Sequence, residues 1–222
     1  MIVCMPYYNR RELLERSMRA YEKLYGRLAL SICDDRSVPP LRLPRTKLKV
    51  TLTRLEGTPE PRNPCVPINT AVSASDDDVI VLTNPEVEHV DPVFDRMRAA
   101  LRFPKDYVIA ACRCAETGRW EARNGLTCRG RLPIPQFSGF HFCTMLHRGL
   151  WNAAGGFNEE YRLGLGCDDN DWLWRLESVG ANFIPLDDCV VYHHPTAKIP
   201  NQSSSARNRQ LLKQCWKHKW NR

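Results

Sequence analysis

Acidic and amide side chains follow two apolar runs in the first half of the chain, where each predicted strand ends. Asp34 and Asp35 directly follow one run, and Asn84 and Glu86 lie just past another. Paired carboxylates at a strand end can accept hydrogen bonds from a nucleobase or a ribose. An amide and a carboxylate two residues apart are hard oxygen ligands, which suit magnesium or manganese bound to a diphosphate. Each motif taken singly is better explained by a polar turn.

Two further groups of residues that could take part in catalysis or metal binding lie near the end of the chain. Asp168, Asp169 and Asp171 stand together at the start of a predicted helix, after a glycine-rich stretch. A carboxylate there can act as a general base, although acids in a first helical turn also complement the helix dipole. His193 and His194 follow a predicted strand. Neutral imidazole binds manganese and similar ions, whereas a single histidine in such a place is more often structural.

Strands that alternate with helices are expected to position these residues. Apolar runs predict strands at 2–5, 28–33, 48–53, 79–82, 107–112, 140–146, 183–186 and 189–192, and periodicity predicts helices at 10–25, 64–75, 92–103, 171–179 and 203–220. The alternation predicts an α/β fold with a Rossmann-like, mostly parallel central sheet flanked by helices in three layers. Such sheets bind ligands at the carboxyl ends of their strands. Residues 115–137 break the pattern and predict a long functional loop.

Charge is distributed unevenly along the 222 residues. The net charge is +7, and no Asp or Glu follows Asp188. Seven cations of the last segment account for the whole net charge: Lys198, Arg207, Arg209, Lys213, Lys217, Lys219 and Arg222. We therefore expect a formally neutral domain at 1–197 and a basic helical extension at 198–222. The extension predicts either an acidic partner or simply a solvated helix face.

The location of the protein is predicted from its apolar runs and its cysteines. No apolar run reaches the length that crosses a bilayer, and the first residues have neither a basic region nor a small-residue cleavage site. Cysteines within strand-like runs act as small apolar residues: Cys4, Cys33, Cys143 and Cys189. We therefore expect a reduced, cytoplasmic setting without a membrane partner.

The motifs occur in an order that resembles family 2 glycosyltransferases of the GT-A fold. The matching stretches are Met5-Pro6-Tyr7-Tyr8-Asn9-Arg10, Asp34-Asp35-Arg36-Ser37, the segment 63–71 with Asn69 and Ala71, Val81-Leu82-Thr83-Asn84-Pro85-Glu86, Gly155-Gly156-Phe157-Asn158-Glu159, Asp168-Asp169-Asn170-Asp171-Trp172-Leu173-Trp174-Arg175 and Val190-Val191-Tyr192-His193-His194. They are similar to that family's P-x-Y-N-R, D-D-G-S, N-x-G-x-N-x-A, metal-binding D-x-D, G-G-F-D-E, E-D-V-D-L-x-x-R and V-V-Y-H-H elements. The last two are the most specific, and the resemblance covers residues 1 to about 194.

The resemblance implies an inverting, metal-assisted transfer of a sugar from a nucleoside-diphosphate donor of the UDP or GDP type to an acceptor hydroxyl. Residues implied in donor binding are Pro6, Tyr7, Asn9, Asp34, Asp35 and Asn84. Glu86 would bind Mn²⁺ or Mg²⁺, and His194 or His193 would complete the metal site. Asp169 would be the general base, with Asp168 as the second choice. The acceptor would be a saccharide or, given the basic tail, a hydroxylated nucleic-acid base.

Three departures and two rival functions accompany this resemblance. The D-x-D element is Asn-Pro-Glu, Arg36 stands in the glycine position of D-D-G-S, and Asp168 replaces the usual glutamate. A nucleotidyltransferase would need a glycine-rich, basic loop after the first strand, which the sequence lacks. A nucleic-acid-binding protein on a catalytically weakened fold would use the basic tail with Trp216 and Trp220.

Overall fold

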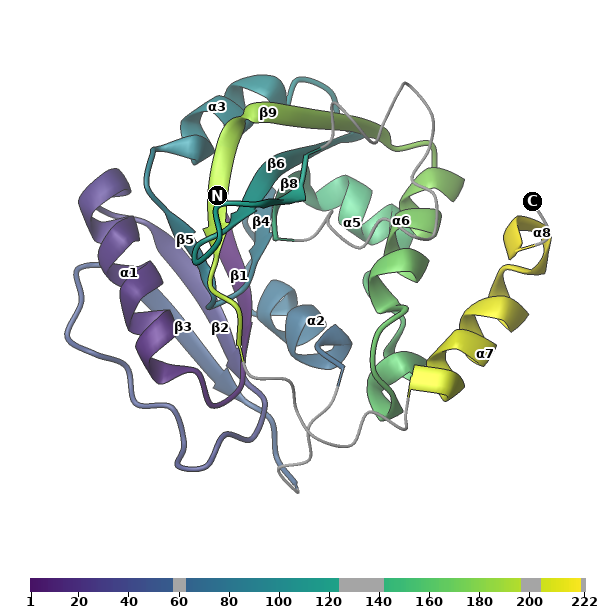
Figure 1. The fold of residues 1–222 in the computed structure, drawn as a ribbon, viewed down its shortest axis with the longest axis horizontal. Coiled ribbons are helices and arrows are strands. Elements are labelled where there is room, and N and C mark those ends of the chain that lie inside the picture. Colours follow the sequence, from purple (N-terminus) through teal and green to yellow (C-terminus); the bar gives the residue numbers. More distant parts are fainter. Residues whose placement is uncertain (58–62, 124–141, 197–204, 221–222) are drawn as a thin grey trace.

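The computed structural model describes residues 1–57, 63–123, 142–196 and 205–220, and within them a nine-stranded sheet (Figure 1). The strands are β1 (Ile2–Tyr7), β2 (Ala29–Asp34), β3 (Lys49–Arg54), β4 (Val79–Thr83), β5 (Val87–His89), β6 (Asp106–Cys114), β7 (Trp120–Ala122), β8 (Cys143–His147) and β9 (Asn182–His193). Their order is β3-β2-β1-β4-β8-β6-β9-β5, with β7 beside β6. β3, β2, β1 and β4 are parallel, and β6 and β9 are parallel to each other. Because β8 is antiparallel to both β4 and β6, these six strands point the same way.

Helices cover both faces of the sheet. They are α1 (Arg11–Tyr25), α2 (Cys65–Ser73), α3 (Val93–Ala100), α5 (Arg148–Ala154), the 3₁₀ helix η1 (Glu159–Leu163), α6 (Asp168–Ser178), α7 (Ser205–Cys215) and α8 (Lys217–Trp220). One apolar cluster joins α1 and α3 to the sheet, and a second joins α2, α5, α6 and α7 to its other face. Alternate residues of β1 enter the two clusters, Val3 and Met5 the first, Ile2 and Cys4 the second. The predicted three-layer, mostly parallel α/β fold is confirmed.

Several element boundaries differ from those predicted. The two strands expected at 183–186 and 189–192 form one strand, β9, whose register on β6 shifts after Leu186. The bulge accommodates Asp187 and Asp188, which interrupt the apolar run. α6 begins at Asp168 rather than Asp171. β5 and β7 were not predicted, because three-residue strands leave little periodicity. The loop expected at 115–137 lies largely outside the described residues.

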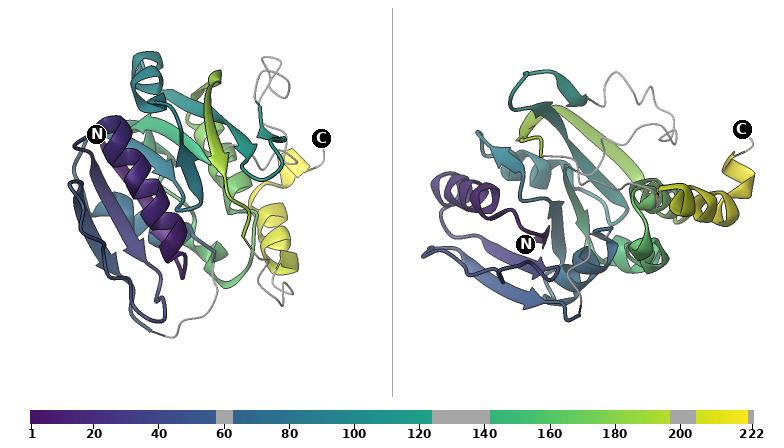
Figure 2. Two further views of the ribbon diagram at one scale, coloured as in Figure 1. Left: turned by 60° about the vertical axis from the view of Figure 1, so that its left-hand side comes forward. Right: turned by 60° about the horizontal axis from the view of Figure 1, so that its bottom comes forward.

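The helix α7 packs on the body of the protein beside η1 and α6 (Figure 2). Leu212 is buried in the apolar cluster under α6. Asn208 is fully buried and donates hydrogen bonds to the main-chain oxygens of Tyr161 at 3.0 Å and Gly166 at 2.9 Å. The part of the chain that the structure describes contains no helix long and apolar enough to cross a membrane.

His89 is a buried, uncharged histidine in the aromatic cluster between α1 and α3. Its ring packs edge-on against Tyr21 and Phe94, with ring centroids 5.0 Å and 4.6 Å apart. Its Nδ1 lies 2.8 Å from the Tyr25 hydroxyl. Burial penalises the imidazolium and lowers the pKa of His89 to about 3. Protonation of this residue is therefore coupled to unfolding.

Acid is expected to destabilise the fold through His89. The unfolded chain takes up this proton below its ordinary pKa of 6.5, whereas the folded chain does not until about 3. Between pH 8 and pH 5 the free energy of unfolding should therefore fall by about 2 kcal/mol from this residue alone. Urea unfolding at both pH values would measure it, with His89→Asn as the comparison because asparagine keeps a partner for Tyr25. An equal pH effect in both proteins would contradict the coupling.

Candidate active site

Two adjoining pockets open at the carboxyl ends of β1 and β4. The first, here the β1 pocket, has a volume of about 210 Å³ and is lined by Pro6, Tyr7, Tyr8, Arg10, Asp35, Pro64, Pro67, Asn84, Pro85 and Glu86. The second, here the α6 pocket, has a volume of about 300 Å³ and is lined by Cys4, Pro64, Ile68, Leu82, Thr83, Asn84, Phe142, Phe157, Gly166, Asp168 and Asp169. Pro64 and Asn84 belong to both walls. The two pockets are therefore adjacent, one at the end of β1 and the other at the start of α6.

Asp34 supports this site from beneath and does not line it. Its carboxylate accepts hydrogen bonds from the main-chain N–H of Ser37 at 2.9 Å and of Leu41 at 3.0 Å, and from the guanidinium of Arg54 at 2.5 Å. Only 1% of Asp34 is exposed. Asp35, by contrast, reaches the wall of the β1 pocket. Of this predicted pair, only Asp35 is therefore placed where a ligand could touch it.

Arg36 turns back onto the protein at the position where the resembling family has glycine. Its φ of +61° is in the left-handed region that glycine adopts easily. The guanidinium pairs with Asp35 and donates to the main-chain oxygen of Glu56 at 2.7 Å. Arg36 thus offsets the charge of Asp35 and leaves the β1 pocket open.

Asn9 fastens two loops beside the β1 pocket. Its side-chain oxygen accepts from the N–H of Val38 at 2.9 Å, and its own N–H donates to the Ser37 hydroxyl at 3.0 Å. Asn9 does not line the β1 pocket, whereas its predicted companions Pro6 and Tyr7 do. The structure therefore gives Asn9 a role in holding the pocket wall.

Arg10 and Glu86 face each other inside the β1 pocket. The Arg10 guanidinium lies 3.2 Å from Oε1 of Glu86. Both side chains are largely covered, with 25% of Arg10 and 15% of Glu86 exposed. Among the described residues, the second oxygen of Glu86, Oε2, and the Arg10 nitrogen of this contact are buried without a hydrogen-bond partner. Buried polar atoms of this kind are rare without a reason, and here they line a pocket.

The two histidines at the end of β9 point to different partners. The main-chain N–H of His194 donates to the main-chain oxygen of Glu86 at 2.8 Å. This bond sets His194 opposite Glu86 beside the β5–β9 pairing. The His194 imidazole lies 2.6 Å from Glu88, and that of His193 lies 2.8 Å from Glu121 on β7. Glu86 and His194 are thus neighbours, while His193 is held toward β7. Among the residues described, no three or more His, Cys, Asp or Glu form a group that could hold a metal ion.

The start of α6 presents Asp168 and Asp169 to the α6 pocket. Asp168 is buried and accepts a hydrogen bond from the Asn63 amide at 2.6 Å. Asp169 is half-buried and lines the pocket together with Leu82 and Phe157. Burial in these surroundings raises the pKa of the Asp169 carboxyl to about 7. Such a carboxylate is well matched to accept a proton near neutral pH.

Asp171, the third acid of this group, faces away from the pocket. It is 1% exposed and accepts from Arg175 at 2.6 Å and from the indole N–H of Trp216 at 2.7 Å. Its role is to hold the end of α7 against α6. The cluster of three acids therefore separates into two that line a pocket and one that is structural.

The Gly155-Gly156-Phe157 turn contributes Phe157 to the lining of the α6 pocket and is fixed by Asn69 of α2. The Asn69 amide donates to the main-chain oxygen of Phe157 at 2.9 Å and accepts from its N–H at 3.0 Å. Gly156 has a φ of +67°, and an added Cβ would lie 3.0 Å from the Asn69 oxygen and 3.1 Å from Trp151. This close approach explains the glycine.

Gly156→Ala is expected to lower the free energy of unfolding by about 1–3 kcal/mol, because the methyl group meets both crowding and a strained φ. Urea unfolding would measure the change. Gly149→Ala is the matched control, because Gly149 lies in α5 with open space around the added Cβ. It should be neutral or slightly stabilising. Equal losses in the two variants would contradict the packing argument.

The chain is similar in structure to several solved proteins that bind nucleotide sugars. S. aureus TarS 1–349 bound to UDP-GlcNAc matches with a TM-score of 0.66 at 13% identity, over 96% of this chain and 70% of that one. Mannosyltransferase PcManGT from Pyrobaculum calidifontis, bound to GDP-Man and Mn²⁺, matches with a TM-score of 0.62 at 18% identity, over 100% of this chain and 64% of that one. The chain spans 60% of another structure of TarS 1–349. These matches show a shared fold, the GT-A-like architecture expected from the sequence.

Sequence comparison adds nothing to this likeness. No protein-family profile matches the chain, and no curated protein matches it either.

Proposed function

We propose that this protein is an inverting glycosyltransferase that moves a sugar from a nucleoside-diphosphate donor to an acceptor hydroxyl. One observation carries the proposal: Glu86 and Asp169 line adjoining pockets that share Pro64 and Asn84. A carboxylate that would bind a cation and a carboxylate that would act as a base therefore line two adjacent pockets. The donors held by the structural neighbours, UDP-GlcNAc and GDP-Man, support the same substrate class.

The donor would occupy the β1 pocket. Tyr7 and Pro6 offer flat, partly apolar walls for a nucleoside, and Asp35 offers hydrogen-bond acceptors for its base or ribose. The guanidinium of Arg10 lies in the same pocket and is suited to the oxygens of the diphosphate. Asp34 and Asn9 would act indirectly, through the loops that they fasten.

A divalent cation fits the free oxygen of Glu86. Oε2 of this residue is buried without a hydrogen-bond partner among the described residues, and a hard cation prefers such an oxygen. Asn84 and His194, which flank Glu86, would complete the set. When bound, Mn²⁺ or Mg²⁺ would supply Lewis-acid stabilisation of the departing diphosphate. Both imidazoles contact a glutamate, but only His194 lies opposite Glu86, whereas His193 pairs with Val87 and its imidazole is held toward β7.

Asp169 would act as the general base in the α6 pocket. The acceptor oxygen forms a bond to the anomeric carbon, the bond from that carbon to the diphosphate oxygen breaks, and the hydroxyl proton passes to the Asp169 carboxylate. Attack from the face opposite the leaving group inverts the anomeric centre. Asp168 is the second candidate, although its hydrogen bond from Asn63 already engages one oxygen. A positioned base contributes about 10²–10⁴-fold in rate.

We propose a saccharide as the acceptor and a cytoplasmic location for the protein. The nine cysteines that the structure describes are all free, and eight of them are at least partly buried, as is usual in a reducing compartment. We further propose that residues 1–197 form the transferase domain and that α7 of the extension is docked on it. No contact among the described residues favours a nucleotidyltransferase or a nucleic-acid-binding function.

The direct test is an assay of nucleoside diphosphate released from a panel of UDP- and GDP-sugars with Mn²⁺ or Mg²⁺, with and without simple saccharide acceptors. We expect release from one donor class, faster with the acceptor. The proposal would be rejected if no donor bound or reacted while the protein remained folded by circular dichroism.

A further inference from the structure

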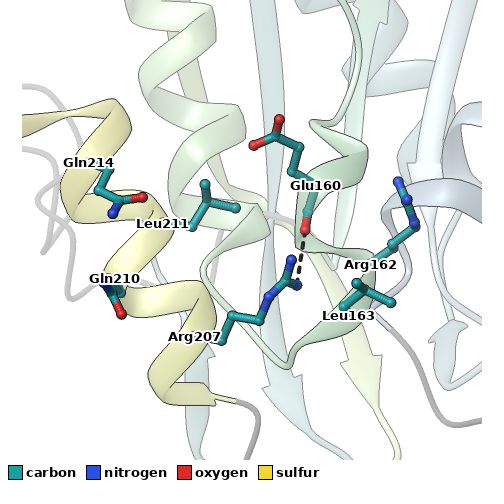
Figure 3. Close-up of a pocket in the computed structure, with 7 residues that line it drawn as sticks. All are labelled: Glu160, Arg162, Leu163, Arg207, Gln210, Leu211 and Gln214. Atoms are coloured by element: carbon teal, nitrogen blue, oxygen red, sulfur yellow. Dashed lines mark hydrogen bonds between the residues drawn. The ribbon is translucent and has the colours of Figure 1, made fainter.

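A third cavity lies outside the two pockets, in a groove between η1 and α7 (Figure 3). Its volume is about 410 Å³. One side is formed by Glu160, Arg162 and Leu163 of η1, and the other by residues of α7 spaced three and four apart, such as Arg207, Gln210 and Gln214. This spacing places one face of α7 along the length of the groove. We call it the η1–α7 groove.

The η1–α7 groove is lined by both polar and apolar side chains, and its charged lining residues are two arginines and Glu160. Arg162 and Arg207 stand on opposite sides, while Glu160 uses its main-chain oxygen to accept from Arg207 at 3.3 Å. Arg209 and Lys213 are exposed on α7 outside the groove. No acidic residue follows Asp188 in the sequence, so α7 contains no carboxylate that could neutralise these cations. The field favours a negatively charged ligand.

The groove and the α6 pocket are connected through a hydrogen bond of Asn208. Asn208, which directly follows the groove residue Arg207, donates to the main-chain oxygen of Gly166 at 2.9 Å. Gly166 lines the α6 pocket together with Asp169. On the other side, only four residues separate Leu163 in the groove from Asp168 in the pocket. The chain between them spans at most about 18 Å when extended, which is a few sugar units.

We propose that the η1–α7 groove binds a stretch of an anionic saccharide acceptor, whose end enters the α6 pocket. The inference rests on the proposed function and specifies its acceptor class. The two arginines would pair with carboxylates of the chain, and the amides of Gln210 and Gln214 would hydrogen-bond its hydroxyls. Single-stranded nucleic acid is the less suitable occupant, because it is usually held by aromatic stacking and no aromatic side chain lines the described groove.

Binding of a fluorescent hexuronate oligosaccharide to the full chain, without donor, tests this proposal. At 0.15 M salt we expect it to bind at least 10-fold more tightly than a neutral oligosaccharide of equal length. Replacing both groove arginines, as Arg162→Gln with Arg207→Gln, should weaken binding at least 10-fold. Leu163→Glu should act likewise, because it adds a negative charge at an exposed groove residue, 56% accessible, without removing a buried contact.

The matched control removes two charges from α7 outside the groove, as Arg209→Gln with Lys213→Gln. It should weaken binding less than 3-fold. Equal losses in the two double variants, no preference over the neutral chain, or tighter binding of single-stranded DNA would each overturn the proposal. Nucleoside diphosphate binding, measured in the same variants, should be unchanged. If the wild type binds the hexuronate but no nucleoside diphosphate, the proposed glycosyltransferase function fails, whereas the proposal that the groove binds an anionic saccharide stands.

Discussion

Asp169→Asn will reduce sugar transfer by about 10²–10⁴-fold, because the amide cannot accept the acceptor proton. Affinity for the nucleoside diphosphate should stay within about 3-fold of the wild type, since Asp169 lines the α6 pocket and not the β1 pocket. Steady-state transfer and calorimetric binding would measure the two effects. Asp188→Asn, at an exposed acid of β9, is the control and should change neither.

The pH profile gives this prediction a second readout. The base must be ionised, and burial raises the pKa of Asp169 to about 7. Transfer by the wild type should therefore fall as the pH drops through 7, rather than near 4 as for an ordinary aspartate. If Asp169→Asn kept more than a tenth of the wild-type rate, Asp169 would not be the base. A larger loss in Asp168→Asn would transfer the role to its neighbour.

Glu86→Gln will remove most of the stimulation by manganese, at least about 10²-fold in transfer, because a Lewis acid stabilises the transition state by several kcal/mol. It should also weaken Mn²⁺ binding in the presence of UDP, measured by electron paramagnetic resonance. His194→Ala should weaken that binding by about 10-fold, since His194 lies opposite Glu86.

His193→Ala is the discriminating control for the metal prediction. His193 pairs with Val87 rather than lying opposite Glu86, and its imidazole is held toward β7 by Glu121 at 2.8 Å, so its loss should leave Mn²⁺ affinity within about 3-fold. Wild-type affinity for Mn²⁺ in Glu86→Gln would exclude Glu86 as a ligand. In that case the positive charge that stabilises the diphosphate would come from the Arg10 guanidinium, which lies 3.2 Å from Glu86, rather than from a metal ion.

The layout of the site could be predicted from the sequence because it follows from topology. The strands predicted at 28–33, 79–82 and 189–192 were expected to bring their following residues to one edge, and Asp35, Asn84 and Glu86 do share the β1 pocket. Whether each side chain points into the pocket or into the protein could not be predicted. Asp34 and Asp35 have the same chemistry in the sequence, yet only one reaches the pocket.

Other features depend on partners distant in the chain. Arg10 ends the stretch that resembles P-x-Y-N-R, but its pairing with Glu86 requires β1 and β4 to be adjacent. The raised pKa of Asp169 depends on apolar residues from several elements. The basic extension was predicted to be a helix with either an acidic partner or a solvated face, because its charges mark the exposed side of α7. Asn208 and Leu212 on the opposite side carry no charge pattern that announces their burial.

The hydrogen bonds from Asn208 and Trp216 have a consequence for the rigidity of the α6 pocket. They come from α7 and the residue that follows it, and they fasten Gly166 and Asp171 on either side of Asp169. A chain that formed its whole sheet without docking α7 would leave the proposed base loosely oriented. Undocking of α7 would therefore lower activity without unfolding the sheet.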